Sequence, residues 1–135
     1  MPHFLVEYSS NLEDALELPA LFEKLHKVAE KGGVFPLAGM RSRGLPRDQY
    51  RLADGHPDNG FVHVNLRVGA GRDVATLRRE GEAIFAVLTE HVDALFKERP
   101  LALSFEISEI HPELNFKKGN IRDYLKARAE EESAA

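Results

Sequence analysis

The chain has 135 residues, of which 43% are hydrophobic and 30% are charged, and its formal net charge is -4. These values are those of one globular domain, large enough to bury a core without metals or disulfides. The absence of cysteine excludes thiolate metal sites, and the six histidines form no i,i+4 pair, so we predict no metal site. A chain without cysteine also fits a reducing compartment, so we predict a cytoplasmic protein. The mild acidity argues against nucleic-acid binding, and no apolar run approaches the roughly 18 residues that a membrane span needs.

The first half of the chain predicts a strand, a helix and a second strand. Residues 4–8 are a short apolar run that ends in a Ser-Ser-Asn turn signal. Residues 18–29 carry apolar side chains three and four positions apart, which predicts an amphipathic helix that ends at a glycine pair. The second strand is predicted over residues 34–40, with Pro36 at its beginning or edge. A polar loop, RSRGLPRDQ, and a short extended piece over residues 50–53 would follow.

The second half predicts the same order of elements. The turn-rich stretch ADGHPDNG separates the halves, and residues 61–68 then alternate strictly between apolar and polar side chains, as in a strand buried on one face. The sequence GAGRD opens a long helix with Asp73 as a plausible N-cap, and the apolar stripe of this helix runs to Phe96. Residues 101–110 alternate again as a final strand, and a short helix is expected around residues 121–129 in a charged tail.

This order is one βαβ unit written twice, over about residues 2–54 and 61–110, followed by a tail over 111–135. We therefore predict a single domain of the α+β class, in which two βαβ units form a four-stranded mixed sheet with two helices on one face. Polar side chains such as His63 and Glu106 would lie on the other face, and a neighbouring subunit is expected to cover it. A sheet with one wet face is the alternative.

Two arginine-bearing segments favour an anionic ligand. GAGRD lacks the third glycine of a dinucleotide fingerprint, yet it combines glycines, Arg72 and the free amides of a helix N-terminus, which together suit a carboxylate. RSRGLPR, which begins at Arg41, adds three more cations, and the guanidinium fork pairs well with a carboxylate. The alternative for both segments is a solvated, charged surface.

Pro2 is the candidate acid–base group. If the initiator methionine is removed, the chain begins with a prolyl secondary amine that can accept and deliver a proton. Apolar neighbours such as Phe4 and nearby arginines would both lower the pKa of this amine toward the working pH, where a general base is most effective. A retained Met1 would instead turn the nitrogen into an amide without basicity, and a proline with no functional role is the alternative.

Four segments resemble the 5-carboxymethyl-2-hydroxymuconate isomerases, a family of the tautomerase superfamily with an amino-terminal proline. They are PHFLVEYS, FPLAGMRSR, ADGHPDNGFVHVNLRVGAGR and LALSFEISEIHPELNFK. The resemblance extends from Pro2 to about Lys117, whereas the RGLPRDQYR region and the acidic carboxyl end have no firm match. The fold that it implies, two βαβ units in a four-stranded sheet that assembles into a homotrimer, agrees with the duplicated pattern.

The resemblance also implies a chemistry: proton transfer on a small-molecule carboxylate substrate, without a cofactor, in the degradation of homoprotocatechuate. Pro2 would act as base and acid, Arg41 and Arg72 would hold substrate carboxylates and steady the charge of a dienolate, and Phe4 would line the site. Two alternatives stay open. One is another enol–keto tautomerase of the superfamily, and the other is a non-catalytic trimeric protein that binds anions.

Overall fold

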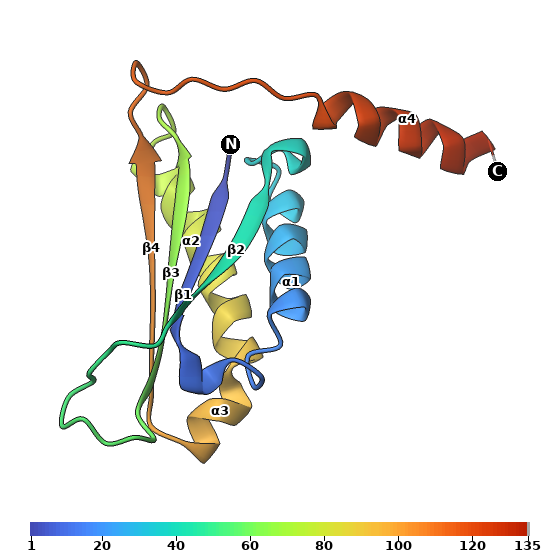
Figure 1. Ribbon diagram of the computed structural model, residues 1–135. Helices are drawn as coiled ribbons and strands as arrows, with labels where there is room; N and C mark the ends of the chain where they lie inside the picture. The colour runs from blue at the N-terminus through green and yellow to red at the C-terminus, as the bar shows by residue number, and fades with distance from the viewer. Residues whose placement is uncertain (135) are drawn as a thin grey trace.

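A computed structural model describes residues 1–134 and shows a single mixed sheet (Figure 1). The strand order is β2-β1-β3-β4. At its centre, β1 (His3–Ser9) pairs in parallel with β2 (Arg41–Arg47) and in antiparallel with β3 (Gly60–Gly69), which pairs in parallel with β4 (Leu101–Ile110). A helix connects the strands of each parallel pair, so the predicted four-stranded mixed sheet of two βαβ units is confirmed.

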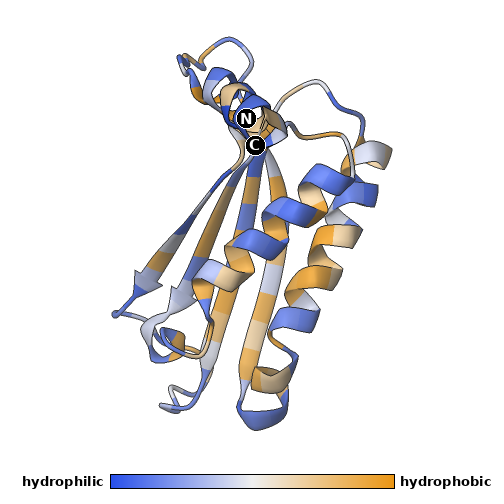
Figure 2. Ribbon diagram, turned by 90° about the vertical axis from the view of Figure 1, so that its right-hand side faces the viewer, coloured by the Kyte–Doolittle hydropathy of each residue, from blue (hydrophilic) through white to orange (hydrophobic). Residues whose placement is uncertain are grey.

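Helices cover only one face of this sheet. In the described part of the chain the helical elements are η1 (Ser10–Leu12), α1 (Leu18–Lys31), η2 (Leu37–Gly39), α2 (Val74–His91), α3 (Asp93–Glu98) and α4 (Ile121–Ala134). Figures 1 and 2 show α1 and α2 side by side against the sheet, whereas α4 stands off the body at the end of an extended arm that leaves β4. Within residues 1–134 no helix combines the length and the apolar character needed to cross a membrane.

The hydrophobic core fills the space between the sheet and the helices α1 and α2. The alternation predicted for β3 is confirmed, because Val62, Val64 and Leu66 are fully buried while the residues between them are half-buried. The predicted N-cap of α2 is also present: the Asp73 side chain accepts a hydrogen bond of 2.7 Å from the Thr76 amide. Regular burial on one face of each strand therefore fixes how the two halves of the domain pack.

The second strand lies one segment later in the chain than we predicted. Residues 37–39 form η2, the strand occupies Arg41–Arg47, where we expected a polar loop, and residues 50–53 belong to no strand. The reason is that β2 lies at the edge of the sheet and carries no apolar alternation that could reveal it. Pro46 is tolerated there because an edge strand can do without one amide donor.

The residues of β2 that face α1 are small rather than apolar. A Cβ atom added to Gly44 would lie 2.9 Å from the Leu18 side chain of α1 and 3.4 Å from the Tyr8 ring. A larger residue would therefore push α1 away from the sheet. Close approach of the helix, not hydrophobic alternation, decides which residues this strand can carry.

Two helix boundaries also differ from the predictions. The helix predicted to run to Phe96 stops at His91, because Val92 leaves the helical region with φ -99° and ψ 9°, and α3 begins afterwards. The break lets Leu95 pack on the core, but Phe96 remains 44% exposed. The terminal helix continues to Ala134 instead of ending near residue 129.

Candidate active site

The amino terminus lies where β1 and β2 begin, side by side at one end of the sheet (Figure 1). The Arg41 amide donates a hydrogen bond of 3.1 Å to the Pro2 carbonyl, so the register of the two strands fixes these residues next to each other. Gly39 permits this approach: a Cβ atom there would lie 3.3 Å from the Met1 Cα and 3.5 Å from the Pro2 Cδ. Pro2 itself is buried.

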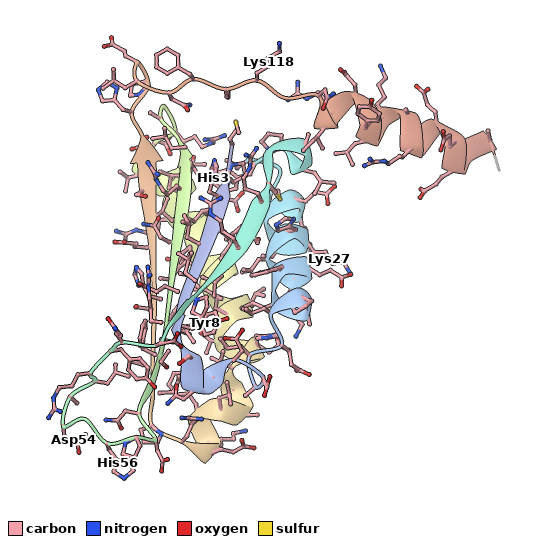
Figure 3. All side chains as sticks on the ribbon, viewed as in Figure 1. His3, Tyr8, Lys27, Asp54, His56 and Lys118 are labelled. Carbon is pink, nitrogen blue, oxygen red and sulfur yellow. The ribbon has the colours of Figure 1, made fainter. Side chains whose placement is uncertain are left out.

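A cleft of about 780 Å³ opens at this end of the molecule. Its walls come from the start of the chain, from the segment that joins η2 to β2, and from the arm with the first turn of α4. The lining residues include Met1, His3, Arg41, Lys117 and Arg122. In Figure 3, His3 lies on β1 beneath the arm that carries Lys118. The cleft is thus strongly cationic, which suits an anionic ligand.

The amine at the start of the chain experiences this charge directly. Burial lowers the pKa of the Met1 α-amino group below its ordinary value of 8.0, and the positive charges of Lys117, Arg72 and Arg41 lower it further. Both causes disfavour the ammonium form. An amine held in this place is therefore closer to a free base at neutral pH than an exposed one.

Arg72 is held in place by the backbone on both sides of the site. Its guanidinium donates hydrogen bonds of 3.1 Å to the Gly69 carbonyl and 3.3 Å to the Val34 carbonyl, and its Cζ atom lies 4.9 Å from the centre of the Phe35 ring. These contacts join the turn between β3 and α2 to the segment before η2. Arg72 is therefore a fixed cation rather than a mobile, solvated one.

His3 and Lys117 are site residues that the sequence analysis missed. Burial lowers the pKa of His3, as do the neighbouring cations Arg41 and Arg43, so its ring stays neutral near pH 7. Its Nδ1 atom lies 3.3 Å from the Arg43 guanidinium. Because side chains alternate along a strand, His3 could have been placed on the face of β1 opposite to Pro2. No periodic pattern predicts that the arm brings Lys117 to the Met1 amine.

The expectation for Phe4 is wrong. Its side chain is fully buried and its ring stacks on His26 of α1, with 6.0 Å between the ring centres. Phe4 therefore belongs to the core beneath the site and offers no surface to a ligand in this chain. The structure brings Pro2, Arg41 and Arg72 to one end of the sheet, but it does not bring Phe4 into the cleft.

A second groove, of about 650 Å³, lies between α2 and β4. Apolar side chains such as Leu77 and Phe105 line it together with the carboxylates of Glu82 and Glu109. These carboxylates repel an anionic ligand, so the cationic cleft is the better candidate. Among residues 1–134 no three histidine or acidic side chains gather in a way that could hold a metal ion.

Comparison with known proteins agrees with this arrangement over most of the chain. A family model described as 5-carboxymethyl-2-hydroxymuconate isomerase matches residues 2–125. The 5-carboxymethyl-2-hydroxymuconate Delta-isomerase of Escherichia coli is 45% identical over 126 residues, which cover 93% of this chain and 100% of that protein. The crystal structure of a 5-carboxymethyl-2-hydroxymuconate isomerase from Deinococcus radiodurans R1 has a TM-score of 0.85 and 40% identity, and the match covers 92% of this chain and 93% of that one.

A likeness in fold alone extends further. The structure of a W0 fused 4-OT wild type symmetric trimer has a TM-score of 0.60 at 16% identity, with 86% of this chain and 93% of that chain covered. This agrees with a tautomerase-like fold of paired βαβ units. Taken with the matches above, it leads to one assignment: the chain belongs to the 5-carboxymethyl-2-hydroxymuconate isomerase family, a family of enzymes.

Proposed function

We propose that the protein converts 5-carboxymethyl-2-hydroxymuconate into its 2-oxo-enoate isomer, and that the nitrogen of Pro2 carries the proton. The observation that supports this most directly is the environment of the chain start. The Met1 α-amino group, which stands there in this chain, has its pKa lowered by burial and by the positive charges of Lys117, Arg72 and Arg41, which come from three separate segments. A prolyl amine exposed by removal of Met1 would meet the same charges, which favour its free-base form and suit a carboxylate substrate.

The reaction needs only one proton carrier. The O–H bond at C2 of the dienol breaks and a C=O bond forms there. One C=C double bond, between C3 and C4, replaces the two of the dienol, and a new C–H bond forms at C5. Atoms and electrons balance, so no cofactor is required. The intermediate is a dienolate, and a guanidinium close to its oxygen stabilises the negative charge as it develops. We assign this role to Arg41, and the binding of a substrate carboxylate to Arg72.

The mechanism requires that Met1 be removed. With Met1 present, the Pro2 nitrogen belongs to a peptide bond and cannot accept a proton. Removal would expose the prolyl amine beside Arg41, to whose amide the Pro2 carbonyl is already hydrogen-bonded at 3.1 Å. The strand pairing would therefore hold the new amine in place without a rearrangement of β1.

We further propose that the enzyme is a homotrimer and works in the cytoplasm in the degradation of homoprotocatechuate. The uncovered face of the sheet supports the trimer, as does the fold shared with a relative described as a symmetric trimer. The family's substrate supports the pathway, because such a compound is a product of aromatic ring cleavage. The cysteine-free sequence fits a reducing compartment.

Three preparations test the proposed proton carrier: processed protein that begins at Pro2, protein that retains Met1, and processed protein with Pro2→Ala. Retention of Met1 should lower kcat by about 10²- to 10⁴-fold, the usual contribution of a general acid–base group. Pro2→Ala keeps a primary amine, so it should leave partial activity. For the processed enzyme the rate should rise with pH as the prolyl amine loses its proton, and this rise should be centred below the pKa of an exposed prolyl amine, because burial and the neighbouring cations lower the pKa of an amine at this place.

Isomerisation can be followed by the loss of dienol absorbance, and intact mass establishes which amino terminus each preparation has. Circular dichroism should give the same fold for all three. Equal rates for the Met1-retaining and processed proteins would show that Pro2 only leads the strand. A processed enzyme that is active on other enols but not on this substrate would favour a different tautomerase activity.

A further inference from the structure

We propose that Lys117, on the arm between β4 and α4, binds the carboxymethyl carboxylate of the substrate and so selects a tricarboxylate over a dicarboxylate. This inference rests on the proposed function. Muconate has a carboxylate at each end of its carbon chain, and the carboxymethyl group adds a third. The substrate thus needs one more cation than a plain hydroxymuconate does.

The path of the arm places Lys117 at the site. After β4 ends at Ile110, the chain crosses above the amino terminus before α4 begins (Figure 1). Lys117 and Arg122 line the same cleft as Met1, His3 and Arg41. The arm is therefore a wall of the candidate site and not a separate tail.

The charge of Lys117 also acts on the amine. Among the charged groups that lower the pKa of the Met1 amino group, Lys117 has the largest effect, ahead of Arg72 and Arg41. Met1 and Lys117 also line the same cleft, so a ligand that fills it can contact both. Lys117, Arg72 and Arg41 thus surround the amine with three cations for a ligand with three carboxylates, and Lys118 and Arg122 add positive charge to the lining of the cleft.

Arg41, Arg72 and Lys117 are held in different ways. Arg41 begins β2 and Arg72 is bonded to two backbone carbonyls, so both belong to the rigid sheet scaffold. Lys117 is exposed and lies outside both βαβ units. We therefore expect Arg41 to serve the C2 oxygen together with the carboxylate next to it, Arg72 to serve the other carboxylate of the muconate skeleton, and Lys117 to serve the added one.

Lys126 on α4 provides a matched control. It is exposed and follows the same arm, but unlike Lys118 it is not among the residues that line the cleft. Its charge is not among those that lower the pKa of the Met1 amine. Lys126→Ala removes the same charge from the same end of the chain, so it corrects for any general loss of positive charge.

The test compares 5-carboxymethyl-2-hydroxymuconate with 2-hydroxymuconate, which lacks the carboxymethyl group. Lys117→Ala should lower kcat/KM for the tricarboxylate by about 10- to 100-fold, as expected when a hydrogen bond to a charged group is lost. It should change kcat/KM for the dicarboxylate by less than about 5-fold, and Lys126→Ala should change either value by no more than that. Lys117→Arg keeps the charge and should restore most of the preference.

The pH profile gives a second readout. Because the charge of Lys117 lowers the pKa of an amine at the chain start, its removal should move the rising limb of the rate to higher pH, whereas Lys126→Ala should leave the limb in place. Equal losses on the two substrates in Lys117→Ala would overturn the proposal, because a role in folding or in the general field does not distinguish them. Unchanged kinetics on both substrates would also overturn it.

A binding measurement separates this inference from the proposed reaction. Propane-1,2,3-tricarboxylate and glutarate differ by one carboxylate, and calorimetry or NMR titration can compare their affinities for the processed protein. Wild type should prefer the tricarboxylate, and Lys117→Ala should abolish that preference while Lys126→Ala keeps it. If the protein isomerises neither muconate but shows this pattern, the reaction is wrong and the role of Lys117 stands. If wild type shows no preference for the tricarboxylate, the role of Lys117 is wrong.

Discussion

The charges of Arg41 and Arg72 both lower the pKa of the Met1 amine, but the two side chains are held in different ways. Arg41 is exposed at the first position of β2, and only its backbone is tied to the chain start. The guanidinium of Arg72 instead satisfies the carbonyls of Val34 and Gly69. Removal of Arg72 would leave these acceptors without their donor and would loosen two loops at once. Arg72 thus holds the structure through its side chain, whereas Arg41 is tied to the chain start through its backbone.

Arg41→Ala and Arg72→Ala should therefore differ in stability as well as in activity. Arg41→Ala should lower kcat by about 10²- to 10³-fold if the guanidinium stabilises the dienolate. Its free energy of unfolding should stay within about 0.5 kcal/mol of wild type, as for most surface substitutions. Arg72→Ala should raise KM and also lower the free energy of unfolding by about 1–3 kcal/mol, through the two unpaired carbonyls. Urea unfolding and steady-state kinetics on the same samples measure both effects.

Near-wild-type kinetics in both variants would contradict the assignment of the carboxylate and dienolate roles. Attention would then move to Arg43 and Arg67, whose charges also act on His3. A destabilised Arg41→Ala variant would show that this side chain has a structural partner.

At the scale of elements, the contact between α1 and α2 contains a buried carboxylate without a matching donor. Glu80 of α2 is only 4% exposed, and its Oε1 atom has no hydrogen-bond partner within the described residues. Arg79 is the nearest cation, at 3.8 Å. The carboxylate packs against Gly32 at the end of α1, where any Cβ atom would collide with it. Burial of this charge costs stability unless the charge is compensated.

Glu80→Met should consequently raise the free energy of unfolding by about 1–3 kcal/mol, because a side chain of similar size replaces an unsatisfied buried carboxylate. Glu82→Met, an exposed position on the same helix, is the control and should change little. Thermal and urea unfolding are the measurements. A destabilised Glu80→Met variant would mean that the carboxylate has a partner that the single chain does not contain, such as a group on another subunit.

The elements that sequence analysis predicted well are those whose apolar spacing is dictated by burial. The alternation of residues 61–68 predicted β3, because one face of that strand is buried along its whole length. The edge strand β2 has small residues inward and arginines outward, so no comparable signal exists. The sequence of β1 does not show that Phe4 faces the core, because residues 4–6 are all apolar, and only the structure shows that Phe4, Val6 and Tyr8 form the buried face.

The site could be predicted in part. Pro2, Arg41 and Arg72 were named from their residue types and from the family resemblance, and strand pairing and one turn bring them to the same end of the sheet. Lys117 could not be named, because its position depends on the path of an irregular arm. Arms of this kind carry no periodicity from which a path can be inferred.

At the scale of the molecule, the face of the sheet opposite α1 and α2 is uncovered (Figure 2). A polar network crosses it, in which His63 contacts Ser104 at 2.6 Å and Glu106 at 3.3 Å, and Ser108 donates to Asn65 at 2.9 Å. Half-buried apolar side chains lie beside this network. Such a mixed face suits contact with further copies of the chain, since the interfaces of oligomers combine apolar cores with hydrogen bonds.

Sedimentation equilibrium should therefore give a particle of three chains of 15.1 kDa each. Leu5→Glu should break this assembly, because Leu5 is half-buried on the open face between Arg43 and Asn65. Phe96→Glu, an equally drastic change on the helix side, should leave it intact. A wild-type protein that stays monomeric at micromolar concentration would contradict the trimer, and dissociation by Phe96→Glu but not Leu5→Glu would place the interface elsewhere.

The duplicated architecture sets the number of terminal amines for each βαβ unit. β1 and β3 lead the two βαβ units, and their antiparallel pairing puts their first residues at opposite ends of the sheet. β3 begins inside the chain at Gly60, whose amide donates to Pro100, so no free amine can arise there. Two units in one chain thus share one terminal amine. In the proposed mechanism the other end, where Asp54 and His56 lie in Figure 3, takes no part in proton transfer, so substitutions there should leave the reaction intact.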